Sequence, residues 1–235
     1  MKKLIVVTGG TQGIGRAVIG KFAAAGMDVA TCSRTPEALA ALKTALEASH
    51  PGIDVHTYSA DMAVKDEVKD FCAYVNSLNR PIDVLVNNAG YFIPGAITTE
   101  PEGTLESMIN ANLYSAYYTT RGLIDRLIGQ PSAHIFNICS IASIQAYPNG
   151  GAYAISKAGL LGFSRNLREE LKSQNVRVTA VLPGATRTAS WNGTPLPDER
   201  FMSSEDVAEA IFSAWSLSPR SVVEEILIRP QLGDI

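Results

Sequence analysis

The chain has 235 residues, of which 46% are hydrophobic and 18% are charged, and its net charge at pH 7 is −3. This composition is typical of a folded α/β domain and argues against an intrinsically disordered chain. The small net charge, with no basic cluster, favours neither a nucleic-acid partner nor a membrane-surface partner.

Apolar strand patterns alternate with helical patterns along the chain, which predicts a parallel sheet covered on both faces. With right-handed crossovers, the result is one doubly wound Rossmann-type domain, residues 1–235, with about seven strands. Ligands of such sheets bind beyond the carboxyl ends of the strands, so functional residues should directly follow strands. In chain order we expect strand 4–8, helix 13–25, strand 28–33, helix 36–48, strand 53–59, helix 64–78, strand 82–87, helix 102–128, strand 133–139, helix 151–173, strand 176–182, helix 204–216 and strand 224–228.

Three cysteines without metal-ligand spacing indicate buried free thiols in a reducing compartment rather than disulfides or a zinc site. The apolar run in MKKLIVV ends at Thr8, too early for a secretory signal, and no apolar run is long enough to span a bilayer. We therefore expect a cytoplasmic protein that binds no metal. The cysteines are Cys32, Cys72 and Cys139, and the histidines, all expected to be structural, are His50, His56 and His134.

The segment VVTGGTQGIGRA joins the first strand to the first helix and places glycines at 9, 13 and 15. Glycines allow a tight turn that brings backbone N–H groups near an anion, and the helix start adds partial positive charge. This position favours a dinucleotide phosphate site over a plain turn. At the end of the second strand, Ser33-Arg34 replace the acid that would hold NAD(H) ribose hydroxyls. Because Arg34 can pair with a 2′-phosphate, we expect NADP(H) to be preferred over NAD(H); an ordinary surface cation is the alternative.

Tyr153 and Lys157 lie four residues apart on an expected helix and therefore share one face. No carboxylate within a turn can pair with the lysine, which is unusual if its amine is buried. A cation about 4 Å from a phenol, at an effective dielectric of about 20, contributes about 4 kcal/mol. That energy corresponds to a shift of about 3 pKa units, enough to lower the pKa of a tyrosine from ~10 towards neutral pH. The spacing thus predicts that Lys157 tunes Tyr153 for proton exchange with a substrate.

Several motifs occur in the order found in short-chain dehydrogenase/reductases: TGGTQGIG (8–15), NNAG (87–90), NANLYSAY with Asn112, CSIAS with Ser140, YAISK (153–157) and LPGATRT (182–188). The chain resembles this family over nearly its entire length. Its tail, PRSVVEEILIRPQLGDI, resembles that of bacterial sepiapterin-reductase-like members. The resemblance implies NADPH-dependent reduction of a carbonyl to an alcohol by hydride transfer.

The same resemblance implies a catalytic tetrad of Asn112, Ser140, Tyr153 and Lys157. Ser140 would hydrogen-bond the substrate oxygen, and Asn112 would hold water in a proton relay that reaches Lys157. A strand-end cap for Ser140 and a helix irregularity for Asn112 are the structural alternatives.

The cofactor contacts are implied in the same way, with Asp61 binding the adenine ring. One position departs from the family pattern, because some NADP(H)-preferring members carry a second basic residue where this chain has Gln12. Arg34 would then carry most of the preference. The implied contacts are Gly9, Thr11, Gln12, Gly13, Ile14, Gly15, Ser33, Arg34, Asp61, Met62, Asn88, Ala89, Gly90, Tyr153, Lys157, Pro183, Gly184, Thr186 and Thr188.

The segment from about 185 to 202 is the expected lid over the nicotinamide. The expected pocket walls leave a simple ketone, a 3-ketoacyl compound or a pterin side chain open as the substrate. Apolar helices 102–128 and 151–173 suggest a homodimer or homotetramer. An NAD-dependent alcohol dehydrogenase and a non-catalytic NADP(H)-binding regulator are the alternative functions. The expected walls are Phe92, Ile141, Tyr147 and Trp191. For Trp191, packing of the loop without a role in the pocket is an equal alternative. Arg187 and Arg200 could serve an anionic substrate.

Overall fold

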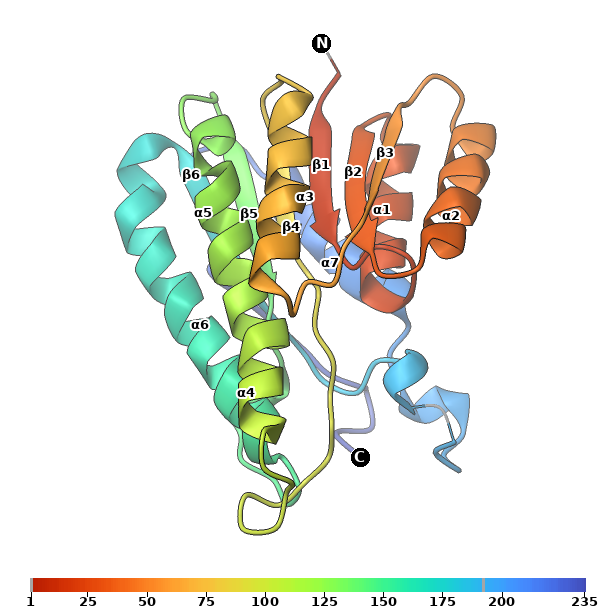
Figure 1. The fold of residues 1–235 in the computed structure, drawn as a ribbon, viewed down its shortest axis with the longest axis vertical. Helices are drawn as coiled ribbons and strands as arrows, with labels where there is room; N and C mark the ends of the chain where they lie inside the picture. The colour runs from red at the N-terminus through yellow and green to blue at the C-terminus, as the bar shows by residue number, and fades with distance from the viewer. Residues whose placement is uncertain (1, 192) are drawn as a thin grey trace.

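A computed structural model describes residues 2–191 and 193–235. Seven parallel strands form one sheet in the order β3-β2-β1-β4-β5-β6-β7, which confirms the expected doubly wound fold. Their carboxyl ends meet at the lower edge in Figure 1. The strands are β1 (Leu4–Thr8), β2 (Asp28–Ser33), β3 (Val55–Ser59), β4 (Val84–Asn87), β5 (Ala133–Ile138), β6 (Val176–Pro183) and β7 (Glu225–Ile228).

Helices cover both faces of the sheet (Figure 1). Side chains from α1, α2 and α7 form one apolar core with the strands, and side chains from α3, α5 and α6 form the other. β1 shows why its sequence is apolar throughout, since Ile5 and Val7 enter the first core while Leu4 and Val6 enter the second. The helices are α1 (Gly13–Ala24), α2 (Pro36–Ser49), α3 (Lys65–Ser77), α4 (Thr104–Ile109), α5 (Ser115–Leu127), α6 (Gly151–Leu171) and α7 (Ser204–Ser216).

The structure is helical from Thr104 to Leu127, close to the expected helix 102–128, but the helix is not regular throughout. The irregularity includes Asn112, for which a helix irregularity was the structural alternative. A π-helical turn, Asn110–Tyr114, separates α4 from α5. Within it the Asn112 amide bonds outside the helix, to the Tyr91 backbone, and just after it the Ser115 hydroxyl donates to the Ala111 carbonyl oxygen at 2.6 Å. Such side-chain bonds compete with helical backbone bonding, and π-turns are frequent at functional sites.

Three strands begin later than expected, β3 at 55 instead of 53, β4 at 84 instead of 82 and β7 at 225 instead of 224. Just before β3 an aspartate side chain takes a backbone N–H, whereas the aspartate just before β4 takes an N–H of β1 and does not explain the later start of β4. Asp28 accepts from the Asp54 N–H at 2.8 Å, and Asp83 accepts from the Leu4 N–H at 2.8 Å. Across the part of the chain that the structure describes, no helix is long and apolar enough to cross a membrane.

A buried polar bridge joins the two central strands to the helices above them. The Asn87 amide of β4 donates to Asn137 Oδ1 of β5 at 2.8 Å and to Thr120 Oγ1 of α5 at 3.0 Å. The Asn137 amide donates in turn to Ser164 Oγ of α6 at 2.8 Å. This bridge lies in an otherwise apolar layer, and its register pairs Asn87 with Asn137.

Candidate active site

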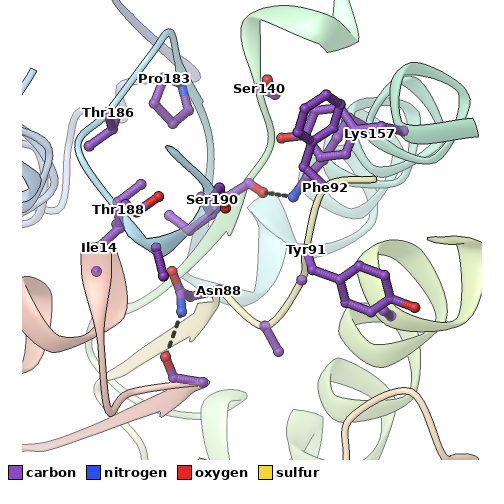
Figure 2. Close-up of a pocket in the computed structure, with 18 of the residues that line it drawn as sticks. Ile14, Asn88, Tyr91, Phe92, Ser140, Lys157, Pro183, Thr186, Thr188 and Ser190 are labelled. Carbon is purple, nitrogen blue, oxygen red and sulfur yellow. Dashed lines mark hydrogen bonds between the residues drawn. The ribbon is translucent and has the colours of Figure 1, made fainter. Parts of the chain in front are cut away.

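A cavity of about 630 Å³ opens at the carboxyl edge of the sheet. It is lined by the segments that follow β1 to β6 and by the end of the tail. Figure 2 shows Asn88 near its middle, with Ile14 and Thr188 to one side and Phe92, Ser140 and Lys157 to the other. Of the predicted cofactor residues all but Gly15 line it, and of the predicted tetrad all but Asn112 do.

The glycine turn is shaped as a phosphate cradle. Gly9 and Gly13 have φ angles of +70° and +53°, which side-chain-bearing residues rarely adopt. Gly15 lies behind the turn, where a Cβ atom would come within 2.4 Å of the Gly9 carbonyl oxygen and 2.5 Å of the Asn88 amide nitrogen. The open backbone at the start of α1 therefore fits a dinucleotide pyrophosphate.

A hydrogen-bonded clasp fixes this turn to the segment after β4. Thr8 Oγ1 accepts the backbone N–H groups of Asn88 and Ala89, both at 3.0 Å. The Asn88 side-chain amide donates back to the carbonyl oxygens of Thr8 and Gly9, both at 2.9 Å, and Figure 2 marks a hydrogen bond from this amide. Asn88 thus joins two edges of the cofactor cavity, and Thr8 is a partner that the motif analysis missed.

The residues after β2 and β3 form the cavity end expected to receive adenosine. Thr11 Oγ1 donates to Ser33 Oγ at 3.0 Å, which ties the glycine turn to the end of β2. Arg34 is exposed and lines the cavity, and its guanidinium makes no hydrogen bond or ion pair with any described residue. Asp61 is oriented by the Glu67 carboxylate, which accepts its N–H at 2.7 Å.

Tyr153 and Lys157 lie at the other end of the cavity, on α6. The lysine is buried, and its Nζ donates to the Ile138 carbonyl oxygen at 2.7 Å, the second bond marked in Figure 2. Burial lowers the pKa of Lys157 to about 8. Nζ lies 5.8 Å from the centre of the Tyr153 ring. The lysine therefore shares the face of the tyrosine, as the spacing predicted.

The expected lowering of the tyrosine pKa is not found. Burial raises the pKa of Tyr153 to about 12, and a side-chain hydrogen bond with Ser140 only partly opposes this rise. The prediction counted only the attraction between the lysine cation and the phenolate, and it left out the free-energy cost of desolvating the phenolate. Tyr153 is consequently held as a protonated donor at neutral pH.

Ser140 is buried and follows β5 at the cavity wall. Its side chain accepts from the Ala142 N–H at 3.1 Å, and its own N–H donates to Ser143 Oγ at 3.2 Å, so it does cap a short 3₁₀ turn, Ile141–Ser143. Ser143 Oγ also donates to the Lys157 carbonyl oxygen at 2.9 Å. The structural alternative and the catalytic prediction are compatible, because the cap fixes the position of the hydroxyl beside Tyr153.

Asn112 lies just below the cavity in the π-turn, and its side chain is buried. Its Oδ1 accepts from the Tyr91 N–H at 2.9 Å, and its amide donates to the Tyr91 carbonyl oxygen at 3.1 Å and to Ser156 Oγ at 2.9 Å. Gly90 permits this approach, because a Cβ there would come within 2.5 Å of Asn112 Oδ1. The water-relay role of Asn112 stays a prediction.

The expected lid, 185–202, borders the cavity through its first half, from Ala185 to Trp191; position 192 lies outside the described residues. Trp191 does both things proposed for it, since it lines the cavity and packs edge-on against Phe201 at 5.2 Å. Neither candidate anion-binding arginine lines the cavity. Arg187 pairs with Asp198 at 2.9 Å, and Arg200 donates to a tail carbonyl oxygen.

Several wall residues were not predicted from the sequence. Asp234 and Ile235 of the tail line the cavity, and Arg229 pairs with Asp234 and donates to Gln145 at 3.3 Å. The tail resemblance does not mark these residues as cavity walls, because they meet the cavity only through the fold of the tail. The Gly9-Gly10 pair in the sequence does indicate one close contact of the fold, because a Cβ atom at Gly10 would lie 2.2 Å from the Thr31 hydroxyl oxygen.

The comparisons with known proteins identify the family. The sequence model described as short chain dehydrogenase matches residues 3–196. A sepiapterin reductase from Chlorobaculum tepidum is 34% identical over 100% of this chain and 99% of its own length. An alcohol dehydrogenase from Thermococcus sibiricus, solved with 5-hydroxy-NADP, superposes with a TM-score of 0.91 at 25% identity, covering 98% of this chain and 97% of that one. An L-sorbose reductase from Gluconobacter frateurii, solved with NADPH and L-sorbose, gives 0.89 at 25% identity over 97% and 95%. The protein therefore belongs to the short-chain dehydrogenase/reductase family of oxidoreductases.

Proposed function

We propose that this protein reduces a carbonyl group to an alcohol with NADPH. The observation that carries the proposal is the meeting of Ser140, Tyr153 and Lys157 at one end of a cavity whose other end is a glycine cradle. Measuring the oxidation of NADPH in the presence of carbonyl compounds tests it directly. Failure of every compound would remove the enzymatic proposal and favour the non-catalytic regulator.

In this proposal each group has a distinct task. The glycine turn holds the cofactor phosphates, and NADPH, when bound, supplies the hydride. The Ser140 hydroxyl hydrogen-bonds the substrate oxygen as negative charge develops there. Tyr153 holds the proton that this oxygen needs, and its pKa of about 12 keeps the proton in place until then. Lys157 places a cation within reach of the phenolate that forms.

The substrate class is proposed from the walls and from the relatives. Phe92, Ile141, Tyr147 and Trp191 give the cavity an apolar, aromatic rim. That rim suits a flat or apolar carbonyl compound. A panel of sepiapterin, L-sorbose, a 3-ketoacyl thioester and simple aryl ketones, compared by kcat/KM, separates these classes. We expect the pterin to rank first, given the full-length similarity to a sepiapterin reductase.

Replacing Arg34 with alanine should narrow the difference between the binding free energies of NADPH and NADH by about 1–3 kcal/mol, because its exposed guanidinium, which has no partner among the described residues, can pair with the 2′-phosphate. Isothermal titration with both cofactors measures the gap. Arg16→Ala is the matched control, since Arg16 is exposed on α1 and outside the cavity lining. A wild-type protein that binds NADH at least as tightly as NADPH would favour the NAD-dependent alcohol dehydrogenase, and a gap that Arg34→Ala leaves unchanged would exclude Arg34 as the residue that holds the 2′-phosphate.

We also propose a homodimer or homotetramer that forms through the α4–α6 face. Leu105, Tyr114, Tyr117 and Ile155 are large apolar or aromatic residues exposed on this face. Sedimentation at micromolar concentration should show an oligomer, and a Tyr117→Glu, Ile155→Glu double variant should sediment as a monomer. A monomeric wild-type protein would contradict this assembly.

A further inference from the structure

The loop between β4 and α4, residues 91–103, is attached to the start of α6 at two points. A side-chain oxygen of Glu100, Oε2, accepts the backbone N–H of Ala152 at 3.2 Å. The Gly95 N–H donates to the Asn149 carbonyl oxygen at 3.0 Å. The loop therefore holds the chain on both sides of the first residue of α6. In Figure 1 this loop projects below α4 at the lower edge of the molecule.

The start of α6 is built to receive that carboxylate. The N-cap of α6 is Gly150, which has no side chain to accept first-turn N–H groups. Gly151 has a φ of +35°, and a Cβ there would lie 2.5 Å from Glu100 Oε2 and 2.3 Å from the Gly95 carbonyl oxygen. Glu100 supplies from a distant segment the acceptor, and the negative charge, that a helix N-terminus favours.

The same loop also touches the reacting phenol. Phe92 packs edge-on against the Tyr153 ring, with ring centres 4.9 Å apart. Tyr153 directly follows Ala152, whose N–H Glu100 binds. The backbone and the ring of Tyr153 are therefore both restrained by one loop.

We propose that Glu100 is a positioning residue, which fixes the first turn of α6 so that the Tyr153 hydroxyl faces the substrate. This inference rests on the function proposed above. A misplacement of about 1 Å can cost on the order of 10²-fold in rate, so loss of one anchor should be measurable in kcat. Tyr153 and Lys157 are the only expected cofactor contacts on α6, and the glycine cradle and the residues expected to receive adenosine lie on other segments, so NADPH affinity should change little.

Glu100→Ala should lower kcat at least tenfold, with the Kd for NADPH within twofold of wild type. Glu100→Gln keeps an acceptor oxygen and should restore most of kcat. Glu102→Ala is the matched control, because Glu102 is exposed in the same segment and forms no hydrogen bond or ion pair with a described residue. Unchanged kcat in Glu100→Ala, an equal loss in Glu102→Ala, or equal losses in the alanine and glutamine variants would each overturn the proposal.

Amide hydrogen exchange tests the anchor without catalysis. In the wild-type protein the Ala152 amide should exchange more slowly than the Gly151 amide, since first-turn amides without an acceptor are unprotected. Glu100→Ala should abolish that difference. Equal exchange of the two wild-type amides would overturn the inference even if the variant did not fold. Absence of carbonyl reduction in the wild type, with Ala152 protected, would instead count against the proposed function alone.

Discussion

Tyr153→Phe is expected to lower kcat by about 10²–10⁴-fold while NADPH affinity stays within a few-fold of wild type. The variant removes one hydroxyl and keeps the ring that packs against Phe92. General acid catalysis contributes about that factor to a rate. Single-turnover absorbance at 340 nm measures the chemical step apart from cofactor binding.

The matched control is Tyr147→Phe, another tyrosine of the same cavity whose pKa is likewise raised by burial. It should retain kcat within about threefold, because its hydroxyl has no assigned proton to deliver. Equal activity of the Tyr153 variant and wild type would exclude Tyr153 as the proton donor. It would also leave the regulator as the better account of the cofactor cavity.

Lys157→Met should give a protein that is more stable but much less active. Burial lowers the lysine pKa from 10.5 to about 8, which corresponds to about 3 kcal/mol of cost for the charged amine at neutral pH. The variant leaves the Ile138 carbonyl oxygen without its donor, a loss of about 1 kcal/mol. We expect a net gain near 2 kcal/mol in free energy of unfolding at pH 7, with kcat at least about 10²-fold lower.

The gain in free energy of unfolding should become smaller as the pH rises. Between pH 8 and 10.5 the unfolded chain holds the lysine proton while the folded protein has released it. The cost to the wild type is therefore complete below pH 8 and disappears as pH rises towards 10.5. Urea unfolding of both proteins without cofactor, at pH 7 and pH 9.5, measures the difference. A constant difference, or a less stable variant at pH 7, would show that the amine is not desolvated.

A surface lysine provides the control for this pair of measurements. Lys172 is exposed beyond the end of α6 and pairs only with Glu169 among the described residues. Lys172→Met should change stability by less than about 1 kcal/mol and leave activity intact. A comparable gain in free energy of unfolding at this position would show that the effect comes from methionine itself rather than from removal of a buried charge.

The sequence predicted the sheet, and it predicted that Tyr153 and Lys157 share one face of a helix, because both follow from local periodicity. It allowed a helix irregularity at Asn112 but predicted neither the π-turn nor its partner, since the side-chain bonds of Asn112 go to Tyr91, twenty-one residues away. It also overestimated the effect of Lys157 on Tyr153. Spacing reports how near a cation lies, whereas the pKa also depends on burial by loops and tail that only the folded chain brings together.

The cavity-lining residues of the tail and Glu100 are further parts of the site that the sequence did not predict. Glu100 belongs to no motif, and it reaches its place through a contact with Ala152, 52 residues away. Asp234 lies in the tail that resembles sepiapterin-reductase-like members, but that resemblance does not mark it as a cavity wall, and its side-chain partner is Arg229 of the same tail. A glycine such as Gly151 gives only an indirect sign of such a contact, because it shows that space is needed without showing what fills it. Long-range side-chain contacts are therefore the part of the site that local patterns cannot predict.

The Asn87–Asn137 bridge has a consequence for how the sheet assembles. Neighbouring apolar strands offer little to distinguish one alignment from the next, because nearly every side chain on them is hydrophobic. Sliding β5 by one residue would turn Asn137 to the opposite face, away from Asn87 and from Ser164. Each stranded amide would cost about 1–3 kcal/mol. The two asparagines thus favour the native alignment of β4 and β5, because a slip of one residue would break the hydrogen bonds that Asn137 makes with Asn87 and Ser164.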